Sequence, residues 1–229
     1  MRNIPTPKQD FATYIARPDT VFVAREQEPP EQLYALGYLP YSGTKNLCDV
    51  FYSARSARVP LPEFELTSEN RRITKKFDGQ FTKERVEHFV PDEAFYDFCT
   101  AYFAQKHGER AMPRERVETI MRMNLIQKTT IYRSLSGQVV AYVLEVEDGA
   151  ISHYWFSFYD LVYAKQSLGM WLILDALRDA KARGLAYYYL GTVYGDKALY
   201  KTNFKPLEWW DGGKWNRDIT LLKELGRKD

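Results

Sequence analysis

Cysteine is scarce in this sequence, which has only Cys48 and Cys99 among its 229 residues. A zinc or iron–sulfur site needs several thiolate or imidazole ligands around one centre, and a secreted disulfide scaffold needs several cysteine pairs. The histidines, His88, His107 and His153, do not supply the missing ligands, because no metal-ligand spacing relates them. We therefore expect no metal site, interpret the histidines as structural or surface residues, and exclude a disulfide scaffold.

Long apolar runs and a strong excess of charge are also absent. No run reaches the roughly 20 apolar residues that cross a bilayer, and residues 1–10 lack the apolar centre of a signal peptide. We therefore expect no membrane contact and a cytoplasmic location. The net charge is only +2, so any nucleic acid must bind through a local basic patch.

One such patch is visible in the first half of the chain, where Arg71, Arg72, Lys75 and Lys76 occur close together. A guanidinium can donate hydrogen bonds to two oxygens of a phosphate or a carboxylate, so the patch can bind a nucleic-acid backbone, such as that of a tRNA, or an acidic acceptor peptide. The alternative is a solvated helix face, which is the commonest meaning of such a cluster.

Regular secondary structure is predicted along most of the chain. Between residues 21 and 66, short apolar runs alternate with prolines, which predicts short strands, many turns and a helix at residues 31–36. Apolar residues at helical spacing predict helices at residues 92–106 and 113–125. Strands joined by hairpin turns are then predicted at residues 129–134, 139–145 and 151–159.

The end of that last strand leads into a pattern typical of a binding site. Asp160 follows the strand directly, and a turn of Ser167, Leu168 and Gly169 opens the next helix. The first N–H groups of a helix have no partner within it, so this turn can bind an anionic or carbonyl oxygen. The alternative is a plain helix start.

The helix after this turn is amphipathic. Its apolar residues recur at spacings of three and four, whereas Asp175, Arg178 and other charged residues are predicted to point outward. Gly184 ends the helix, and the aromatic-rich run at residues 186–190 predicts a buried strand.

Several short motifs occur in a fixed order along the chain. Those in the C-terminal half are Phe158-Tyr159-Asp160, Ser167-Leu168-Gly169, Arg183-Gly184-Leu185, Tyr189-Leu190-Gly191 and the run from Tyr200 to Glu208. Those in the N-terminal half are Ser42-Gly43, Arg58-Val59-Pro60, and Ser68 with Arg71-Arg72. In residues and in order, the chain resembles the aminoacyl-tRNA protein transferases, which comprise the arginyl-tRNA protein transferases and their bacterial leucyl-transferring relatives.

The resemblance implies an α+β, acetyltransferase-like (GNAT) fold, and the predicted order of elements agrees with it. We predict a small N-terminal α+β subdomain at residues 1–80 and an acetyltransferase-like aminoacyltransferase domain at residues 81–229. The family usually carries clustered cysteines in its N-terminal half. Only Cys48 lies near that place here, so the cysteine-bound metal of some family members is not expected.

The activity that the resemblance implies is transfer of an amino acid, arginine or leucine, from charged tRNA to an acceptor amine. That amine would be the N-terminal α-amine of a protein or peptide that begins with Asp or Glu. Charged tRNA is then the donor substrate and no cofactor is expected. The ester on the tRNA is already activated, so positioning supplies most of the rate.

Site residues can be assigned on the same basis. Asp160 and Tyr200 are the predicted catalytic residues, with Asp160 accepting a proton from the amine; its alternative role is a turn-capping carboxylate. The amides of residues 167–169 are predicted to bind the donor. Lys201 and Lys205, which match a donor-site segment of the family, are predicted to meet tRNA phosphates. A solvated helix face is the alternative for Lys205.

Two other functions fit parts of the pattern. An acetyl-coenzyme A N-acetyltransferase would share the fold, but residues 165–171 contain one glycine and do not match the usual Gln/Arg-x-x-Gly-x-Gly/Ala pyrophosphate loop. A catalytically silent binding module would also keep the fold. The intact segment at residues 200–208 argues against such a module, because its sequence suggests no packing role.

Overall fold

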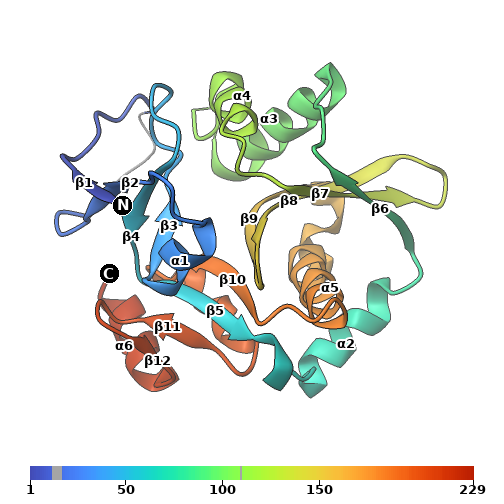
Figure 1. Ribbon diagram of the computed structural model, residues 1–229. Coiled ribbons are helices and arrows are strands. Elements are labelled where there is room, and N and C mark those ends of the chain that lie inside the picture. Colours follow the sequence, from blue (N-terminus) through green and yellow to red (C-terminus); the bar gives the residue numbers. More distant parts are fainter. Residues whose placement is uncertain (12–16, 109) are drawn as a thin grey trace.

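An eight-stranded sheet forms the centre of the computed structural model, which describes residues 1–11, 17–108 and 110–229 (Figure 1). The strand order is β12-β11-β5-β10-β9-β8-β7-β6. β9 and β10 run parallel, and the other neighbouring pairs are antiparallel. The strands are β5 (Ser56–Pro60), β6 (Phe81–Glu87), β7 (Lys128–Ser134), β8 (Val139–Asp148), β9 (Ile151–Tyr159), β10 (Tyr187–Thr192), β11 (Glu208–Trp210) and β12 (Trp215–Asn216).

The predicted strands of the second half are confirmed in this sheet. The three strands joined by hairpin turns are β7, β8 and β9, and the buried aromatic run is β10. Gly137 and Gly149, in the two hairpin turns, have φ angles of 87° and 52°. Glycine adopts this left-handed region without the steric cost that a side chain brings, so the turns fix the register of the hairpins.

A smaller, four-stranded sheet comes from the N-terminal part and has the order β1-β2-β4-β3. It packs against the large sheet through a cluster that joins Tyr34 and Phe51 to Tyr189 of β10. The predicted helix at residues 31–36 is confirmed as α1. These elements are β1 (Arg2–Ile4), β2 (Phe22–Ala24), α1 (Pro30–Ala35), β3 (Tyr38–Pro40) and β4 (Val50–Ser53).

Helices cover the large sheet: Figure 1 shows α3 and α4 on one side of β7 to β9, and α5 with α2 on the other. Asp92 caps α3 by accepting the N–H of Phe95 at 2.8 Å. Within the described ranges, no helix has the length and apolarity that a membrane span needs. The α-helices are α2 (Ser68–Phe77), α3 (Glu93–His107), α4 (Arg114–Arg122), α5 (Leu168–Ala182) and α6 (Ile219–Lys228). The 3-10 helices are η1 (Leu61–Glu63), η2 (Leu161–Gln166) and η3 (Asp196–Asn203).

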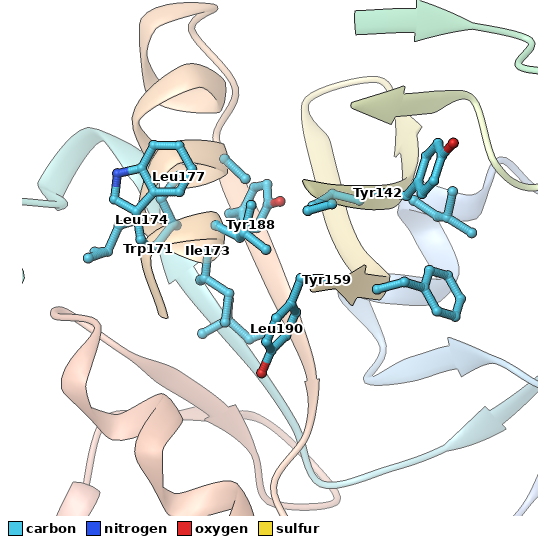
Figure 2. Packing of buried hydrophobic residues seen from close by; sticks show 14 of the residues in the cluster. Tyr142, Tyr159, Trp171, Ile173, Leu174, Leu177, Tyr188 and Leu190 are labelled. Atoms are coloured by element: carbon cyan, nitrogen blue, oxygen red, sulfur yellow. The ribbon is translucent and has the colours of Figure 1, made fainter. Parts of the chain in front are cut away.

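The apolar face predicted for the helix after the Ser-Leu-Gly turn is confirmed in α5. Figure 2 shows side chains of α5, including Ile173 and Leu177, beside Tyr188 and Leu190 of β10. Truncating a fully buried leucine costs about 2–5 kcal/mol, so this face holds the helix on the sheet. The buried residues of the face are Leu168, Leu172, Ile173, Ala176, Leu177 and Ala180.

The prediction that Asp175 points to solvent is wrong. Its side chain is buried and accepts hydrogen bonds from the Tyr132 hydroxyl at 2.8 Å and from the Lys83 amine at 2.7 Å. Both partners come from β6 and β7, which extend the sheet beneath this turn of the helix. A buried carboxylate with these partners is a structural group.

The two predicted parts of the chain share the large sheet. β5 belongs to the predicted N-terminal subdomain, yet it pairs with β10 on one side and β11 on the other. α2, from the same part, packs against α5. The sheet therefore crosses the boundary placed between residues 80 and 81, and that boundary stays a prediction.

A buried ion pair ties the N-terminal motif Arg58-Val59-Pro60 to the segment at residues 200–208. Arg58 Nε donates to Glu208 Oε2 at 2.8 Å. The Arg58 guanidinium also lies over the rings of Tyr187 and Trp215, at 3.8 and 3.9 Å from their centroids. Phe204 and Leu207 of the same segment are core residues. The view that this segment has no packing role is therefore wrong.

Candidate active site

A cavity of about 220 Å³ lies beside the point where β9 and β10 separate. The two strands pair from Tyr187 opposite Ile151 to Tyr189 opposite His153. A register shift in the pairing of β10 with β5 follows between Tyr189 and Gly191. The cavity is lined by residues that follow the paired stretch on both strands, together with residues of β3, α4 and η3.

Gly191 gives two cavity nitrogens room to approach the backbone of β10. Its φ is 79°, in the left-handed region that favours glycine. A Cβ placed there would lie 3.5 Å from His153 Nε2 and 3.6 Å from Lys201 Nζ. His153 Nε2 and Lys201 Nζ therefore both lie beside Gly191 in the cavity wall.

His153 is a neutral imidazole in this wall. Its side chain is buried, and Nδ1 lies 2.8 Å from the Tyr34 hydroxyl. Burial lowers the pKa of His153 to about 3, and the nearby Lys201 adds to the shift. At neutral pH one ring nitrogen carries a proton and the other accepts, with Tyr34 fixing the ring.

Lys201 supplies a desolvated amine to the same place. Its Nζ donates to the Thr192 carbonyl oxygen at 2.6 Å, and burial lowers its pKa to about 8. An amine with this pKa is mostly protonated at pH 7 but gives up its proton more easily than an exposed lysine. It can stabilise a developing negative charge or exchange a proton near neutral pH.

The charge of the cavity is positive. Arg116 from α4 lines it together with Lys201, and no carboxylate is among the described residues of the lining. Arg116 is buried and donates from Nη2 to the Ser42 hydroxyl at 3.3 Å. Aromatic side chains of Tyr52, Tyr154 and neighbouring residues provide apolar walls. The cavity therefore suits a group that carries negative charge.

The predicted catalytic Asp160 lies at the far end of β9. Its side chain is exposed and Oδ1 accepts the N–H of Val162 at 3.0 Å, which caps η2. Asp160 comes seven residues after His153, which corresponds to about 23 Å along β9 at about 3.3 Å per residue. The structure thus gives Asp160 the geometry of a turn-capping carboxylate. Its Oδ2 has no hydrogen bond to a described residue.

The predicted donor turn lies at the start of α5, where Ser167 adopts φ 72°. The Ser167 N–H donates to the Ala164 carbonyl at 3.2 Å, so of the three predicted donor amides this one is already paired. The Tyr159 hydroxyl lies against this turn, because a Cβ on Gly169 would be 3.0 Å from it. Leu168 points into the core.

The other predicted donor residues divide between the cavity and the surface. Tyr200 is exposed, with 41% of its surface accessible. Lys205 is exposed and lines a different groove with Thr67 and Arg217. Only Lys201 of this group lines the cavity.

The predicted basic patch lies on the exposed face of α2. Arg72 pairs with Glu69, and Arg71 donates to the Leu66 carbonyl at 2.6 Å. Lys75 and Lys76 occupy the last turn. None of the four lines the cavity described here.

Sequence reasoning missed His153, Tyr34 and Arg116 as members of the site. The partners His153 and Tyr34 are separated by 119 residues, and no spacing rule relates them. The signal that was available is Gly191, which interrupts a buried strand and marks a close approach of other groups. Among the described residues, no group of three or more His, Cys, Asp and Glu side chains could hold a metal ion.

Comparison with known proteins places the chain in a family. The acetyltransferase (GNAT) domain family matches residues 68–205. The aspartate/glutamate leucyltransferase of Caulobacter vibrioides (strain NA1000 / CB15N) is 30% identical over 201 residues, covering 79% of this chain and 67% of that protein. The protein of the same name from Paracoccus denitrificans (strain Pd 1222) is 29% identical over 191 residues, covering 73% and 66%.

The chain therefore belongs to the acetyltransferase (GNAT) domain family and, within it, to the aspartate/glutamate leucyltransferases, as a divergent member of the aminoacyl-tRNA transferases. It spans about two thirds of the length of these relatives. The resemblance and the GNAT fold predicted from the sequence are confirmed, and the chain is a transferase-family protein.

Solved structures were also compared. FemX gives a TM-score of 0.49 at 11% identity and covers 76% of this chain and 63% of its own. L-PGS from Bacillus licheniformis gives 0.47 at 14% identity and covers 71% and 49%. Similarities of this size say nothing about substrates.

Proposed function

We propose that this protein transfers leucine from charged tRNA to the N-terminal α-amine of a protein or peptide that begins with Asp or Glu. The curated relatives carry the name aspartate/glutamate leucyltransferase. The observation that carries the proposal is the desolvated amine of Lys201 in the cavity, whose described lining includes no carboxylate. Because charged tRNA is the donor, the reaction takes place in the cytoplasm.

The cavity distinguishes between substrate side chains by charge and size. An Asp or Glu side chain would pair with the Lys201 amine, whereas an arginine side chain would add a further cation beside it, which is costly in a desolvated site. This favours leucine over arginine as the transferred residue. The volume of about 220 Å³ lies below the roughly 300–1,000 Å³ of pockets that enclose a whole drug-sized ligand. The cavity suits reacting ends of substrates better than an entire coenzyme.

The proposed reaction needs little beyond positioning. The neutral α-amine attacks the carbonyl carbon of the aminoacyl ester, the new C–N bond forms, and the C–O bond to the terminal ribose breaks. One proton leaves the amine nitrogen and one reaches the ribose oxygen. Lys201 is placed to stabilise the carbonyl oxygen as it becomes negative, beside the neutral His153. The ester is already activated, so no cofactor is part of the proposal.

Asp160 and Tyr200 are both proposed to contact substrate, at different places. Asp160 Oδ2 is available to bind a substrate ammonium outside the cavity, at the far end of β9, since only Oδ1 accepts from Val162. Tyr200 directly precedes Lys201 and is accessible to substrate. The α2 cations are proposed as an outer contact for the tRNA backbone or the acceptor, since they lie outside the cavity.

The test is a transfer assay with a full set of charged tRNAs and peptides that begin with Asp, Glu, Asn or Gln, read by mass spectrometry. We expect a gain equal to one leucine residue on the Asp and Glu peptides only. The amides are the matched controls, because they keep the shape and remove the charge. An N-acetylated Asp peptide checks that the α-amine is the acceptor.

Two results would contradict the proposal. Equal transfer to Asp and Asn peptides would show that the cavity does not recognise the acidic side chain of the acceptor. A gain of one acetyl group from acetyl-coenzyme A, with no gain from any charged tRNA, would assign the chain to acetyl transfer. No gain from either donor, with tRNA still bound, would identify a silent binding module.

A further inference from the structure

A second cationic feature lies at the C-terminal end of α3. Lys106 Nζ donates to the Tyr102 hydroxyl at 2.5 Å and to the Tyr159 hydroxyl at 2.8 Å. The amine also lies 4.9 and 4.7 Å from the centroids of these two rings. No ion pair joins Lys106 to a carboxylate within the described residues.

This arrangement leaves a hydrogen-bond donor for a ligand. An ammonium has three N–H donors, and the tyrosines accept two of them. Lys106 is exposed, whereas Tyr102 and Tyr159 are buried, so the remaining N–H faces solvent. A fixed cation with an N–H donor left over matches an oxygen of a phosphate.

The start of α5 adjoins this cluster. The Tyr159 hydroxyl, which holds Lys106, lies against the first turn of the helix at Gly169. The partial positive charge of that helix end adds to the charge of the amine. The Lys106 amine of α3 and the first turn of α5 therefore both lie against the Tyr159 hydroxyl.

Further cations and an exposed ring surround the cluster. The pKa of His107 is lowered by burial and by the charges of Lys106 and Lys197, which places both lysines near it. Lys197 and Tyr200 are exposed on η3. Tyr200 lies close enough to Tyr159 to be influenced by its hydroxyl. An aromatic ring beside cations is the combination that binds single-stranded nucleic acid, by stacking on a base and pairing with a phosphate.

The surface is continuous with the cavity. Tyr154, which lines the cavity, and Tyr159, which holds Lys106, lie on the same strand, β9. Tyr200 directly precedes Lys201, which lines the cavity. A strand end bound on this surface would lead its terminal ribose toward Lys201.

We propose that Lys106, held by Tyr102 and Tyr159, binds a backbone phosphate of the single-stranded 3′ end of the donor tRNA, with Tyr200 stacking on a base. This inference rests on the proposed function and assigns the donor end to the surface formed by α3, the start of α5 and η3. The α2 cations, which lie on a different helix, are then dispensable for binding the 3′ end.

The test measures binding of a fluorescent, uncharged RNA ending in single-stranded CCA to the full chain by anisotropy, over a range of salt. Lys106→Met should weaken binding about tenfold and lower the salt slope by about one, because one phosphate contact is lost. Tyr200→Ala should weaken binding about tenfold with an unchanged slope. Lys228→Met, at an exposed lysine in the last turn of α6, is the matched control and should bind as the wild type does.

Thermal unfolding shows that each variant is folded, and Lys106→Arg should recover most of the binding. Wild-type affinity and slope in folded Lys106→Met would overturn the site, as would an equal loss of affinity in the Lys228→Met control. Displacement of the RNA by coenzyme A at equal concentration would assign the phosphate site to a different donor and overturn it as well. If the wild type binds RNA through Lys106 but transfers no amino acid, the proposed function fails and this site stands. If transfer occurs and Lys106→Met leaves the KM for charged tRNA unchanged, the site fails and the function stands.

Discussion

Replacing Lys201 by methionine should make the protein more stable and less active. The ordinary pKa of a lysine is 10.5, and burial lowers that of Lys201 to about 8. One pKa unit corresponds to about 1.4 kcal/mol, so holding the charged amine in the fold costs up to ~3 kcal/mol at neutral pH. Methionine has a similar length and no charge. The hydrogen bond to the Thr192 carbonyl, lost in the variant, offsets about 1 kcal/mol.

The expected net gain is about 1–2 kcal/mol in the free energy of unfolding at pH 7. A chain of this size gains about 2–4 °C in Tm for each kcal/mol, so a shift of several degrees is expected. The gain must also depend on pH. The folded pKa lies below the unfolded one, so the wild type bears the full cost below pH 8. It becomes more stable as pH rises from 8 toward 10.5, while the variant does not.

Urea unfolding of both proteins between pH 7 and pH 10 is the assay, with Lys205→Met as the control. Lys205 is exposed and belongs to the same segment, so its variant should show no change in stability at either pH. Leucine transfer measured in parallel should fall sharply in Lys201→Met alone. A Lys201→Met protein that is less stable than the wild type, by an amount independent of pH, would refute the reasoning about a desolvated amine.

Three further substitutions test other parts of the structure. Glu208→Gln should destabilise the chain by about 3 kcal/mol in urea unfolding, because it leaves the buried Arg58 without its counter-ion; a loss under 1 kcal/mol would contradict a buried pair. Gly191→Ala should lower the free energy of unfolding by about 1–2 kcal/mol, because its φ is 79°. It should also slow transfer by more than the smaller amount of folded protein explains; normal turnover per folded molecule would mean that the reaction takes place elsewhere. Asp160→Asn should change stability by less than about 1 kcal/mol, since an amide oxygen still caps η2, and should leave transfer nearly unchanged, because Asp160 lies outside the cavity; a loss of roughly 100-fold at pH 7 that shrinks as pH rises would contradict this placement. Turnover unchanged across the pH range would leave Asp160 as a cap.

Local patterns predicted those elements whose stability depends on neighbours in sequence. α5 and the hairpins of β7, β8 and β9 follow from periodicity and turn glycines, and both were predicted correctly. The position of β5 was not, because its partners β10 and β11 come from the other end of the chain. Pairing between distant strands leaves no trace in the periodicity of either strand. For the same reason, the sequence could not show that Asp175 lies over β6 and β7.

The site depended on distant contacts even more strongly. Lys201 was singled out through a family resemblance, and the structure adds that its amine is desolvated and lies beside Gly191. His153 was interpreted as structural or surface because a lone histidine has no spacing partner. Its proximity to Tyr34 and Lys201 depends on the packing of the small sheet against β9 and β10. Side chains brought together in this way are visible only once the sheets are assembled.

The segment at residues 200–208 contains residues that stabilise the fold and one residue, Lys201, that does not. Phe204, Leu207 and Glu208 pack into the core or pair with Arg58, so a catalytically silent protein would need them as well. Lys201 is different, because within the described residues it has no ion pair and its burial costs stability. Natural proteins commonly keep such destabilising groups at functional sites, where activity depends on them. The argument for an active enzyme therefore rests on the desolvated lysine, and the opposite changes in stability and transfer expected for Lys201→Met test it directly.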